Sequence, residues 1–438
     1  MLGELRLSAD IIVVGSGPGG ATVARELSKK GKQLLLLERG YDHRKRFYYG
    51  TYLGALLYSE RMSLLFTEEG LNIIAPIMLG GATSMYCACA SQPPAWLKHQ
   101  YGVDTTAEVE EVTRELNVQP LPEPLLGEAS TRIAQAGQAL GYNWYAQPKF
   151  MDPARCAERF SCQASCMLGC RCGAKWNAAE WVDDALAHGA RLRVGAKVRR
   201  VLIQDGQAVG VQGALGGRPF TANAETVILA AGGIGSPRIL QNSGLNEAGV
   251  GMTMDTTAIV YGLSRHRGTG PEPPMTWSWE DPDGAYMLST LTDPWLLYPT
   301  AAVRKGMGPT LQWFQWRRLL GVMIKLKDDI SGGIYPDGRI RKPLTSDDSM
   351  RLNGAYEVCR KILVEAGAGK SSIFMRPFIG THPSGTVRIG DALDTNLKTE
   401  IEGLYVCDAS VFPEALDRPT VLTIISLGKR LARHLLCR

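Results

Sequence analysis

Residues 10–20, DIIVVGSGPGG, constrain the fold of this chain more than any other stretch. A short apolar, β-branched run comes first and predicts a buried strand. Gly15, Gly17 and Gly20 follow at the spacing G-x-G-x-x-G, and residues 21–31, ATVARELSKKG, predict a helix that a glycine closes. In such a unit the first glycine permits a tight turn, the second lets the backbone approach a pyrophosphate, and the third allows close packing of helix on strand.

A second apolar run, KQLLLLERG, ends in an acid at the position that a nucleotide site needs. This acid is Glu38, eighteen residues after Gly20. A carboxylate at this place can accept hydrogen bonds from ribose hydroxyls, and the helix N-terminus stabilises phosphate charge. A bare glycine triplet often marks only a loop, but here strand, helix and acid are all present. We therefore expect a dinucleotide site, and these residues alone do not distinguish NAD from FAD.

The length and composition narrow the class of protein. At 438 residues the chain exceeds the size at which single hydrophobic cores stop growing, which favours two domains, interleaved in sequence. Its 45% hydrophobic and 21% charged residues fit a folded α/β protein and lack the polar bias of disorder. The net charge of +5 is too small and too evenly spread to indicate a nucleic acid as partner.

The sequence shows no signal for export or for membrane insertion. No basic stretch with a long apolar core opens it, and no later stretch offers about eighteen uncharged apolar residues in a row. We therefore expect a cytoplasmic location. In a reducing compartment the ten cysteines are expected to be thiols, metal ligands or redox groups rather than structural disulfides.

Three further stretches carry recognisable motifs. They are LGGATSMYCACASQPP at 79–94, VILAAGGIGSPRILQNSG at 227–244, and the C-terminal pair THPSGTVRIGD at 381–391 with GLYVCDASVFPEALDRPTVLTIISLGKRLARHLL at 403–436. Together with the glycine turn, they resemble the glucose-methanol-choline (GMC) family of FAD-dependent oxidoreductases. The resemblance covers both ends and the middle of the chain and is weak between residues 250 and 375.

This resemblance implies an α/β fold with a discontinuous Rossmann-like FAD-binding domain and an α+β substrate domain built on an antiparallel sheet. We expect the FAD-binding domain in residues 1–95, 190–250 and 376–438, and the substrate domain in residues 96–189 and 251–375. The residues themselves agree with this architecture. Hairpins are predicted to turn at Asp205-Gly206 and Asp337-Gly338, and a helix is predicted from Ser346 to the glycine at 367.

The resemblance also implies which residues contact FAD. They lie in the glycine turn, after the second strand, in the loop over the flavin, at an adenine-contacting strand and in the C-terminal motif. The set is Gly15, Gly17, Gly20, Glu38, Arg39, Gly80, Gly81, Ser84, Val198, Asp408, Ala409, Pro419 and Thr420. We expect noncovalent FAD, because no attachment motif is recognisable.

Two residues of the C-terminal motifs are the expected catalytic groups. The family chemistry moves a hydride from a C–H beside a hydroxyl to the flavin while a base takes the hydroxyl proton. His382, at the head of HPSGT, is expected to be that base, since imidazole titrates near neutral pH. Arg418 stands where family members usually carry Asn or His. It cannot act as a base, but it can stabilise an alkoxide, a substrate carboxylate or an anionic reduced flavin. The alternative is an ion pair of Arg418 with Asp417 or another neighbour, away from the flavin.

A cysteine cluster, SCQASCMLGCRCGAK at 161–175, leaves several interpretations open. Its spacing matches neither a common zinc site nor a ferredoxin motif. Part of it resembles a segment of the long-chain alcohol oxidase branch of the family, which implies a structural role. The functional hypothesis is an iron-sulfur cluster that passes electrons to a protein or quinone acceptor, with zinc or a redox disulfide as alternatives. The candidate ligands are Cys156, Cys162, Cys166, Cys170 and Cys172.

The region between residues 275 and 318 is rich in tryptophan. Trp277, Trp279, Trp313 and Trp316 suit a bulky or apolar alcohol, and their nearness in sequence to Arg317 and Arg318 also suits peripheral contact with a membrane. The alternative is a packed core.

Two rival functions are compatible with the same fold. One is a flavin-dependent lyase or decarboxylase, and the other is a noncatalytic electron-transfer subunit.

Overall fold

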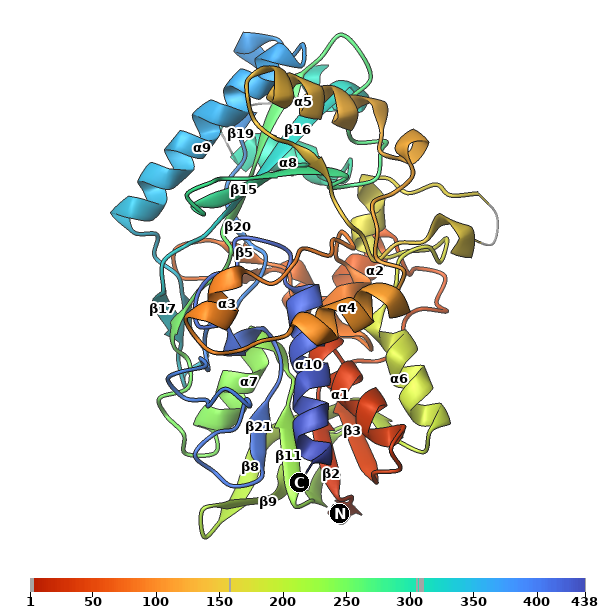
Figure 1. Cartoon of the computed structure of the whole chain (residues 1–438), viewed down its shortest axis with the longest axis vertical. Coiled ribbons are helices and arrows are strands. Elements are labelled where there is room, and N and C mark those ends of the chain that lie inside the picture. Colours follow the sequence, from red (N-terminus) through yellow and green to blue (C-terminus); the bar gives the residue numbers. More distant parts are fainter. Residues whose placement is uncertain (1–3, 157–158, 305, 307–310, 438) are drawn as a thin grey trace.

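The computed structural model describes residues 4–156, 159–304, 306 and 311–437. The lower half of Figure 1 contains a five-stranded parallel sheet with the order β21-β11-β2-β3-β7. Strand β2 (Ile11–Val14) reads IIVV and is buried throughout, as expected for a central strand covered on both faces. The other strands are β3 (Leu34–Glu38), β7 (Arg191–Val194), β11 (Thr226–Leu229) and β21 (Leu404–Val406). This confirms the Rossmann-like sheet expected from the sequence.

Helices from both ends of the chain pack together beside this sheet. Helix α1 (Pro18–Ser28) follows the glycine turn and has proline at its first position, which suits a helix start. It packs against α10 (Val421–Leu436) and α6 (Ala178–Ala187), and α10 packs against α4 (Thr106–Glu115). The C-terminal helix is therefore part of the same core as the N-terminal strand.

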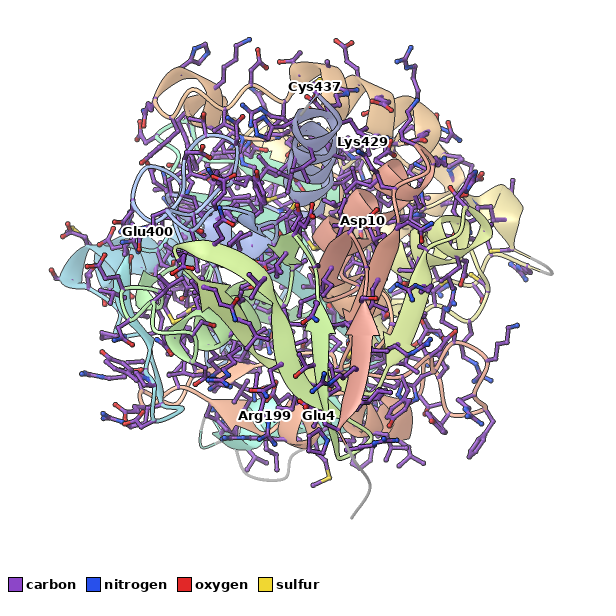
Figure 2. All side chains as sticks on the ribbon, turned by 90° about the horizontal axis from the view of Figure 1, so that it is seen from below. Glu4, Asp10, Arg199, Glu400, Lys429 and Cys437 are labelled. Carbon is purple, nitrogen blue, oxygen red and sulfur yellow. The ribbon has the colours of Figure 1, made fainter. Side chains whose placement is uncertain are left out.

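Lys429 ties three of these helices together. Its ammonium is almost fully buried and lies 2.9 Å from a carboxylate oxygen of Glu26 on α1, and of Glu111 and Glu115 on α4. Figure 2 shows Lys429 on α10 from below. A buried charge is tolerated only when it is paired, so this contact specifies how α10 docks on α1 and α4.

A four-stranded sheet with the order β1-β10-β9-β8 adjoins the parallel sheet. Its strands are β1 (Leu5–Ser8), β8 (Ala196–Gln204), β9 (Gln207–Leu215) and β10 (Arg218–Asn223). The hairpin predicted at Asp205-Gly206 joins β8 to β9, and both turn residues have positive φ, which suits this two-residue turn. Helix α7 (Gly232–Gln241) packs on β8.

The upper half of Figure 1 is built on a nine-stranded, mostly antiparallel sheet, as the predicted substrate domain requires. Helix α9 (Ser346–Glu365), predicted from the sequence, covers it with α5 (Glu128–Ala139), and α8 (Leu297–Arg304) lies nearby. The central strands are β13 (Thr257–Leu263), β16 (Leu319–Leu326), β15 (Tyr286–Thr290) and β14 (Trp277–Glu280). Shorter strands extend it: β4 (Leu65–Phe66), β5 (Asn72–Ile73), β6 (Tyr145–Ala146), β19 (Phe374–Met375) and β20 (Ile379–Gly380).

A small antiparallel sheet holds the second predicted hairpin. Its strands are β12 (Val250–Met252), β17 (Ser331–Ile334) and β18 (Ile340–Arg341), and Asp337-Gly338 lies in the turn between the last two. The remaining elements are short: α2 (Tyr52–Leu57), α3 (Ala95–His99), and the 3-10 turns η1 (Glu60–Ser63), η2 (Gly81–Ser84), η3 (Glu123–Leu125), η4 (Pro153–Arg155), η5 (Ala164–Leu168), η6 (Leu311–Arg318), η7 (Lys370–Ser372) and η8 (Ala409–Val411).

The two sheets draw on interleaved parts of the chain. All five parallel strands come from the ranges expected for the FAD-binding domain. Helices α4 and α6 also pack into that core although they come from residues 96–189, and β4, β5 and β20 join the large antiparallel sheet. The domain boundaries stay a prediction.

Within the described residues, no helix has the length and apolar character needed to cross a membrane.

Candidate active site

The glycine turn between β2 and α1 leaves space beside its backbone. Gly15 has a φ of +104°, and a Cβ there would lie 2.2 Å from the carbonyl oxygen of Ala230, after β11. A Cβ at Gly20 would lie 2.0 Å from the carbonyl oxygen of Gly15. At Gly17, by contrast, no described atom lies within 4 Å of that position, and α1 begins there without a side-chain cap. A phosphate has room to approach the N–H groups of α1.

Glu38 is held beside this turn. Its carboxylate is buried and accepts hydrogen bonds from the N–H (2.9 Å) and hydroxyl (2.6 Å) of Ser16 and from the N–H of Gly40 (2.7 Å). Arg39, the next residue, pairs instead with Glu60 at 2.8 Å. The structure thus places Glu38 at the glycine turn, whereas the guanidinium of Arg39 is committed to an ion pair.

The predicted flavin-covering loop lies against the same turn. Gly80 has positive φ, and a Cβ there would lie 2.0 Å from the side-chain oxygen of Asn177. A Cβ at Gly81 would lie 3.0 Å from the Cα of Gly17, so two glycine-rich segments that are far apart in sequence are in close contact. Ser84 is buried and accepts a hydrogen bond from the Asn177 amide at 2.9 Å. Asn177 has no counterpart in the sequence-based predictions.

Asp408 connects the C-terminal motif to α7. One carboxylate oxygen accepts hydrogen bonds from the N–H of Gly232 (2.8 Å) and the hydroxyl of Ser236 (2.5 Å), and the other accepts from the N–H (2.8 Å) and hydroxyl (2.6 Å) of Ser410. Burial raises the pKa of Asp408. Ala409 opens η8 directly after it.

The other predicted cofactor residues lie at structural transitions. Val198 lies beside an irregularity in the pairing of β8 with β9, where a strand is locally unpaired. Pro419 and Thr420 directly precede α10, and Thr420 is buried. The glycine turn, the loop at 80–84 and the start of α7 fit a dinucleotide. The contacts that individual residues make with FAD stay predictions.

His382 contacts a carboxylate that the sequence analysis did not single out. Its Nδ1 lies 2.8 Å from Oδ2 of Asp255, across 127 residues of sequence. Asp255 is fully buried and has a φ of +45°, an unusual conformation for a non-glycine residue that surrounding contacts maintain. The N–H of His382 also donates to the carbonyl oxygen of Met254 at 3.0 Å, which anchors the two segments to each other.

Electrostatics favour a neutral imidazole here. Burial, and next the nearby Lys325, lower the pKa of His382 well below its ordinary value. Burial raises the pKa of Asp255 to about 6, and Lys325 opposes this shift. A neutral His382 that donates from Nδ1 to the Asp255 carboxylate has an unprotonated Nε2. That nitrogen can accept a proton.

Lys325 places a buried ammonium next to this pair. It lies on β16, where every residue is buried, and its Nζ donates to the hydroxyls of Thr381 (2.8 Å) and Thr257 (3.4 Å). Burial lowers the pKa of Lys325, against the effect of Asp255. The available sequence signal was a single lysine inside the apolar run LLGVMIKL, which buried strands rarely carry without a partner.

Arg418 belongs to a chain of polar contacts that reaches Asp255. Its Nε lies 2.7 Å from Asp417 and its Nη2 lies 3.1 Å from Glu280. The N–H of Asp417 donates to Oδ1 of Asp255 at 3.2 Å, and Tyr145 donates to Glu280 at 2.8 Å. The ion pair with Asp417 that the sequence left as an alternative is therefore present, and two carboxylates balance the guanidinium charge.

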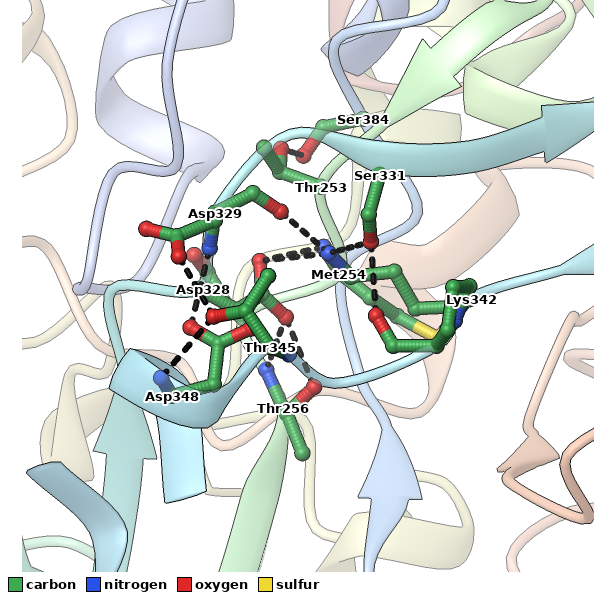
Figure 3. Close-up of polar contacts among 12 residues, drawn as sticks. Thr253, Met254, Thr256, Asp328, Asp329, Ser331, Lys342, Thr345, Asp348 and Ser384 are labelled. Carbon is green, nitrogen blue, oxygen red and sulfur yellow. Dashed lines mark hydrogen bonds and ion pairs between the residues drawn. The ribbon is translucent and has the colours of Figure 1, made fainter. Parts of the chain in front are cut away.

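A second buried network fixes the segment that carries Asp255 (Figure 3). The carboxylate of Asp328 accepts hydrogen bonds from the N–H groups of Met254 (3.0 Å) and Thr256 (2.9 Å), on either side of Asp255. The Lys342 ammonium lies 3.7 Å from Asp328, and both side chains are fully buried. On the other side, the hydroxyls of Thr253 and Ser384 are 2.8 Å apart, so the loop that carries His382 is held to the same segment.

The cysteines do not converge on one point. Cys162 hydrogen-bonds Cys166, Cys156 hydrogen-bonds Cys172, and the sulfurs of Cys170 and Cys172 are 3.8 Å apart. The described residues contain no group of three or more His, Cys, Asp or Glu side chains arranged to hold a metal ion. The iron-sulfur and zinc hypotheses are therefore not supported, because the side chains that bind a zinc ion or an iron-sulfur cluster must surround a single centre.

The contacts of the segment agree better with the structural alternative. Lys175 is buried and donates from Nζ to the carbonyl oxygens of Ser84 (3.2 Å), Tyr86 (2.9 Å) and Cys166 (3.0 Å). The cysteine-rich segment is thus tied to the loop at 80–84. The hydrogen bond from Cys162 lowers the pKa of Cys166 to about 6.

The tryptophans predicted to meet substrate or membrane are mostly packed inside. Trp279 and Trp316 are buried, and the indole N–H of Trp316 donates to the carbonyl oxygen of Asp293 at 2.8 Å. Trp277 is half-buried and donates to Thr131 at 3.1 Å. The side chain of Trp313 lies outside the described residues. The core alternative therefore holds for the three that are described.

The parallel sheet with its glycine turn is typical of dinucleotide-binding folds, and a histidine beside a buried carboxylate lies in the same molecule. Comparison with family models specifies the class of protein. The N-terminal GMC oxidoreductase model matches residues 58–257, the C-terminal model matches residues 344–428, and an NAD(P)-binding Rossmann-like model matches residues 13–43. The chain belongs to the GMC oxidoreductase family, which confirms the resemblance read from its motifs.

Individual relatives are more distant. An uncharacterised protein of Methanocaldococcus jannaschii is 25% identical over 98% of this chain and 100% of its own length. A long-chain-alcohol oxidase of Arabidopsis thaliana is 24% identical over 96% of this chain and 66% of its own length. Among solved structures, pyridoxine 4-oxidase from Mesorbium loti shares the fold, with a TM-score of 0.71 at 15% identity over 98% of this chain and 99% of that one.

Proposed function

We propose that this protein is an FAD-dependent enzyme that oxidises a CH–OH group, with His382 as the general base. The observation that carries the proposal is the 2.8 Å contact between Nδ1 of His382 and the buried Asp255, which orients the ring and directs Nε2 to proton acceptance. FAD, when bound, supplies an acceptor for the hydride.

The chain's own residues divide the remaining work. The glycine turn and Glu38 would hold the adenosine and pyrophosphate, and the loop at 80–84 with Asp408 would hold the flavin end. Nε2 of His382 takes the hydroxyl proton while Asp255 stabilises the imidazolium that forms. Lys325 supplies positive charge where the alcohol oxygen becomes negative. Arg418 also adds positive charge near the alcohol oxygen. Its effect is smaller than that of Lys325, because Asp417 and Glu280 balance the charge of its guanidinium.

The rival functions make different predictions for the flavin. A net oxidation leaves the flavin reduced when oxygen is absent, whereas a lyase or decarboxylase need not change its redox state. The holoenzyme is therefore titrated anaerobically with primary alcohols of increasing chain length, and the flavin absorbance is recorded. Bleaching by alcohol supports the proposal. An oxidised flavin after turnover of a carboxylic acid would favour the rival.

The substrate class and the electron acceptor are the finer parts of the proposal. Named relatives act on long-chain alcohols or on pyridoxine, so an alcohol of moderate or large size is the first to test. The expectation of a protein or quinone acceptor rested on the cysteine cluster, whose geometry does not support an iron-sulfur relay. Turnover under oxygen, compared with turnover on a soluble quinone without oxygen, tests the acceptor.

Gly17→Ala is expected to lower the affinity for FAD by about tenfold or more without unfolding the apoprotein. Its φ of −63° suits alanine and the new methyl meets no described atom, but it would occupy the space that the pyrophosphate needs. The readout is the ratio of flavin to protein absorbance after dialysis. Gly354→Ala is the matched control, because a Cβ there also meets no described atom and Gly354 lies on α9, away from the turn. Equal flavin content in both variants would contradict this placement of the cofactor.

The rate of flavin reduction is expected to fall as the pH falls through about 6. The pKa of Asp255 is raised to about 6, so acidification protonates the carboxyl that orients and stabilises His382. Asp255→Asn should lower the rate at neutral pH and remove this acidic limb. Both effects are measured by stopped-flow flavin reduction at pH values from about 5 to about 8, which bracket the pKa of Asp255. A limb near pH 6 that persists in Asp255→Asn would assign it to another group.

A further inference from the structure

Large apolar side chains gather on an exposed region made of two segments, which we call the apolar face. One segment comprises residues 47–66, which include α2 and β4, and the other comprises residues 295–304, which include α8, together with Phe314. The N–H of Leu296 donates to the hydroxyl of Tyr52 on α2 at 3.1 Å, and α8 packs on η6, so the segments adjoin. Phe47 is 83% exposed and Phe314 is 77% exposed. Leu53, Leu57 and Leu64 are also exposed.

Such a surface is unusual for a protein that stands alone in water. Single exposed apolar residues are normal, but gathered ones mark an interaction site. The inner sides of the same segments pack normally: Tyr58 and Tyr298 are almost fully buried. The exposed residues are thus the outer side of an ordered surface.

The charge on and beside the apolar face is mostly positive, and the acid within it, Glu60, pairs with Arg39. The sequence contains no Asp or Glu from His43 to Ser59, and none from Pro294 to Lys327. Lys45, Arg46, Arg304 and Arg317 are exposed there, and in the described part of the chain none of the four pairs with a carboxylate. Elsewhere on the molecule, exposed arginines such as Arg339 do pair. Apolar side chains flanked by unpaired cations match the acyl and headgroup layers of an anionic membrane.

We propose that the apolar face docks this enzyme on the surface of an anionic phospholipid membrane. The apolar side chains of α2 and α8 enter the boundary between headgroups and acyl chains, and Lys45, Arg46, Arg304 and Arg317 contact the headgroups. This site differs from the tryptophans considered from the sequence, which are packed inside. The proposal does not depend on the reaction that the enzyme catalyses.

The test is flotation of the purified holoenzyme with vesicles. One set consists of phosphatidylcholine alone, and the other of equal parts phosphatidylcholine and phosphatidylglycerol. The wild-type protein should float with the anionic set, and salt should weaken this binding. Lys45→Gln/Arg46→Gln should weaken it by roughly tenfold or more, and Phe47→Asp/Leu57→Asp should abolish it. Met350→Asp is the control, since Met350 is 66% exposed but lies on α9.

All four substituted residues are exposed and outside the proposed catalytic site, so flavin content and turnover of a water-soluble alcohol should stay unchanged. Failure of wild type to float, equal binding to both vesicle sets, or equal loss in Met350→Asp would overturn the proposal. Gel filtration over a range of protein concentrations tests whether a second copy of this chain covers the apolar face instead. A dimer that Phe47→Asp/Leu57→Asp dissociates would make the face a contact between copies and would overturn membrane docking.

Discussion

His382→Ala is expected to slow flavin reduction by an alcohol by about 10²- to 10⁴-fold while flavin stays bound. The reason is that no other described imidazole lies next to Asp255, so no second neutral base is in place to take the hydroxyl proton. Anaerobic stopped-flow absorbance measures the rate, and the flavin spectrum of the resting enzyme checks cofactor content.

His188→Ala serves as the control, because His188 is exposed at the end of α6 and contacts Asp184 only locally. It should reduce flavin at the wild-type rate. If His382→Ala also does so, the general-base role is wrong, and a noncatalytic electron-transfer subunit becomes the better description. A lost flavin spectrum in His382→Ala would instead show that the residue supports cofactor binding.

Lys342→Met is expected to lower the free energy of unfolding by about 3–5 kcal/mol, because it leaves the Asp328 carboxylate buried without its cation. Asp328 also accepts the backbone hydrogen bonds that fix Met254 and Thr256, so activity should fall together with stability. Denaturant unfolding of the holoenzyme, followed by flavin fluorescence, measures the loss.

Two comparisons make this prediction specific. Arg360→Met removes an exposed ion pair with Glu357 on α9 and should change stability by less than about 1 kcal/mol. Adding Asp328→Asn to Lys342→Met should recover part of the loss, since the uncompensated charge is then removed. A Lys342→Met variant as stable as Arg360→Met would contradict the importance of the buried pair.

Much of the fold could be predicted because its signals are local. The β-branched run before Gly15, the turns at Asp205-Gly206 and Asp337-Gly338, and the capping sequence before α9 each fix a backbone conformation within a few residues. The ion-pair partners of charged residues on helices could not be predicted from the sequence. The partners of Lys429 lie on α1 and α4, and no spacing within α10 indicates them.

The site divides in the same way. His382 could be proposed because it stands in a contiguous motif, but its partner Asp255 lies 127 residues away. Arg418 was visible as an unusual residue, whereas its pairing with Glu280 depends on how β14 approaches the C-terminal motif. For the cysteines, closeness in sequence suggested one cluster, and the backbone separates them into smaller groups.

The sequence by itself determined the nucleotide-binding unit, the family and the candidate base. Each of these depends on residues close together in sequence, and the spacing of those residues sets the local backbone geometry. Only the tertiary structure decided that Asp255 and Lys325 surround His382, that Arg418 is balanced by two carboxylates, and that apolar residues near positions 50 and 300 form one face. These features arise from contacts between distant segments, and such contacts follow from the packing of whole sheets and helices rather than from any local pattern.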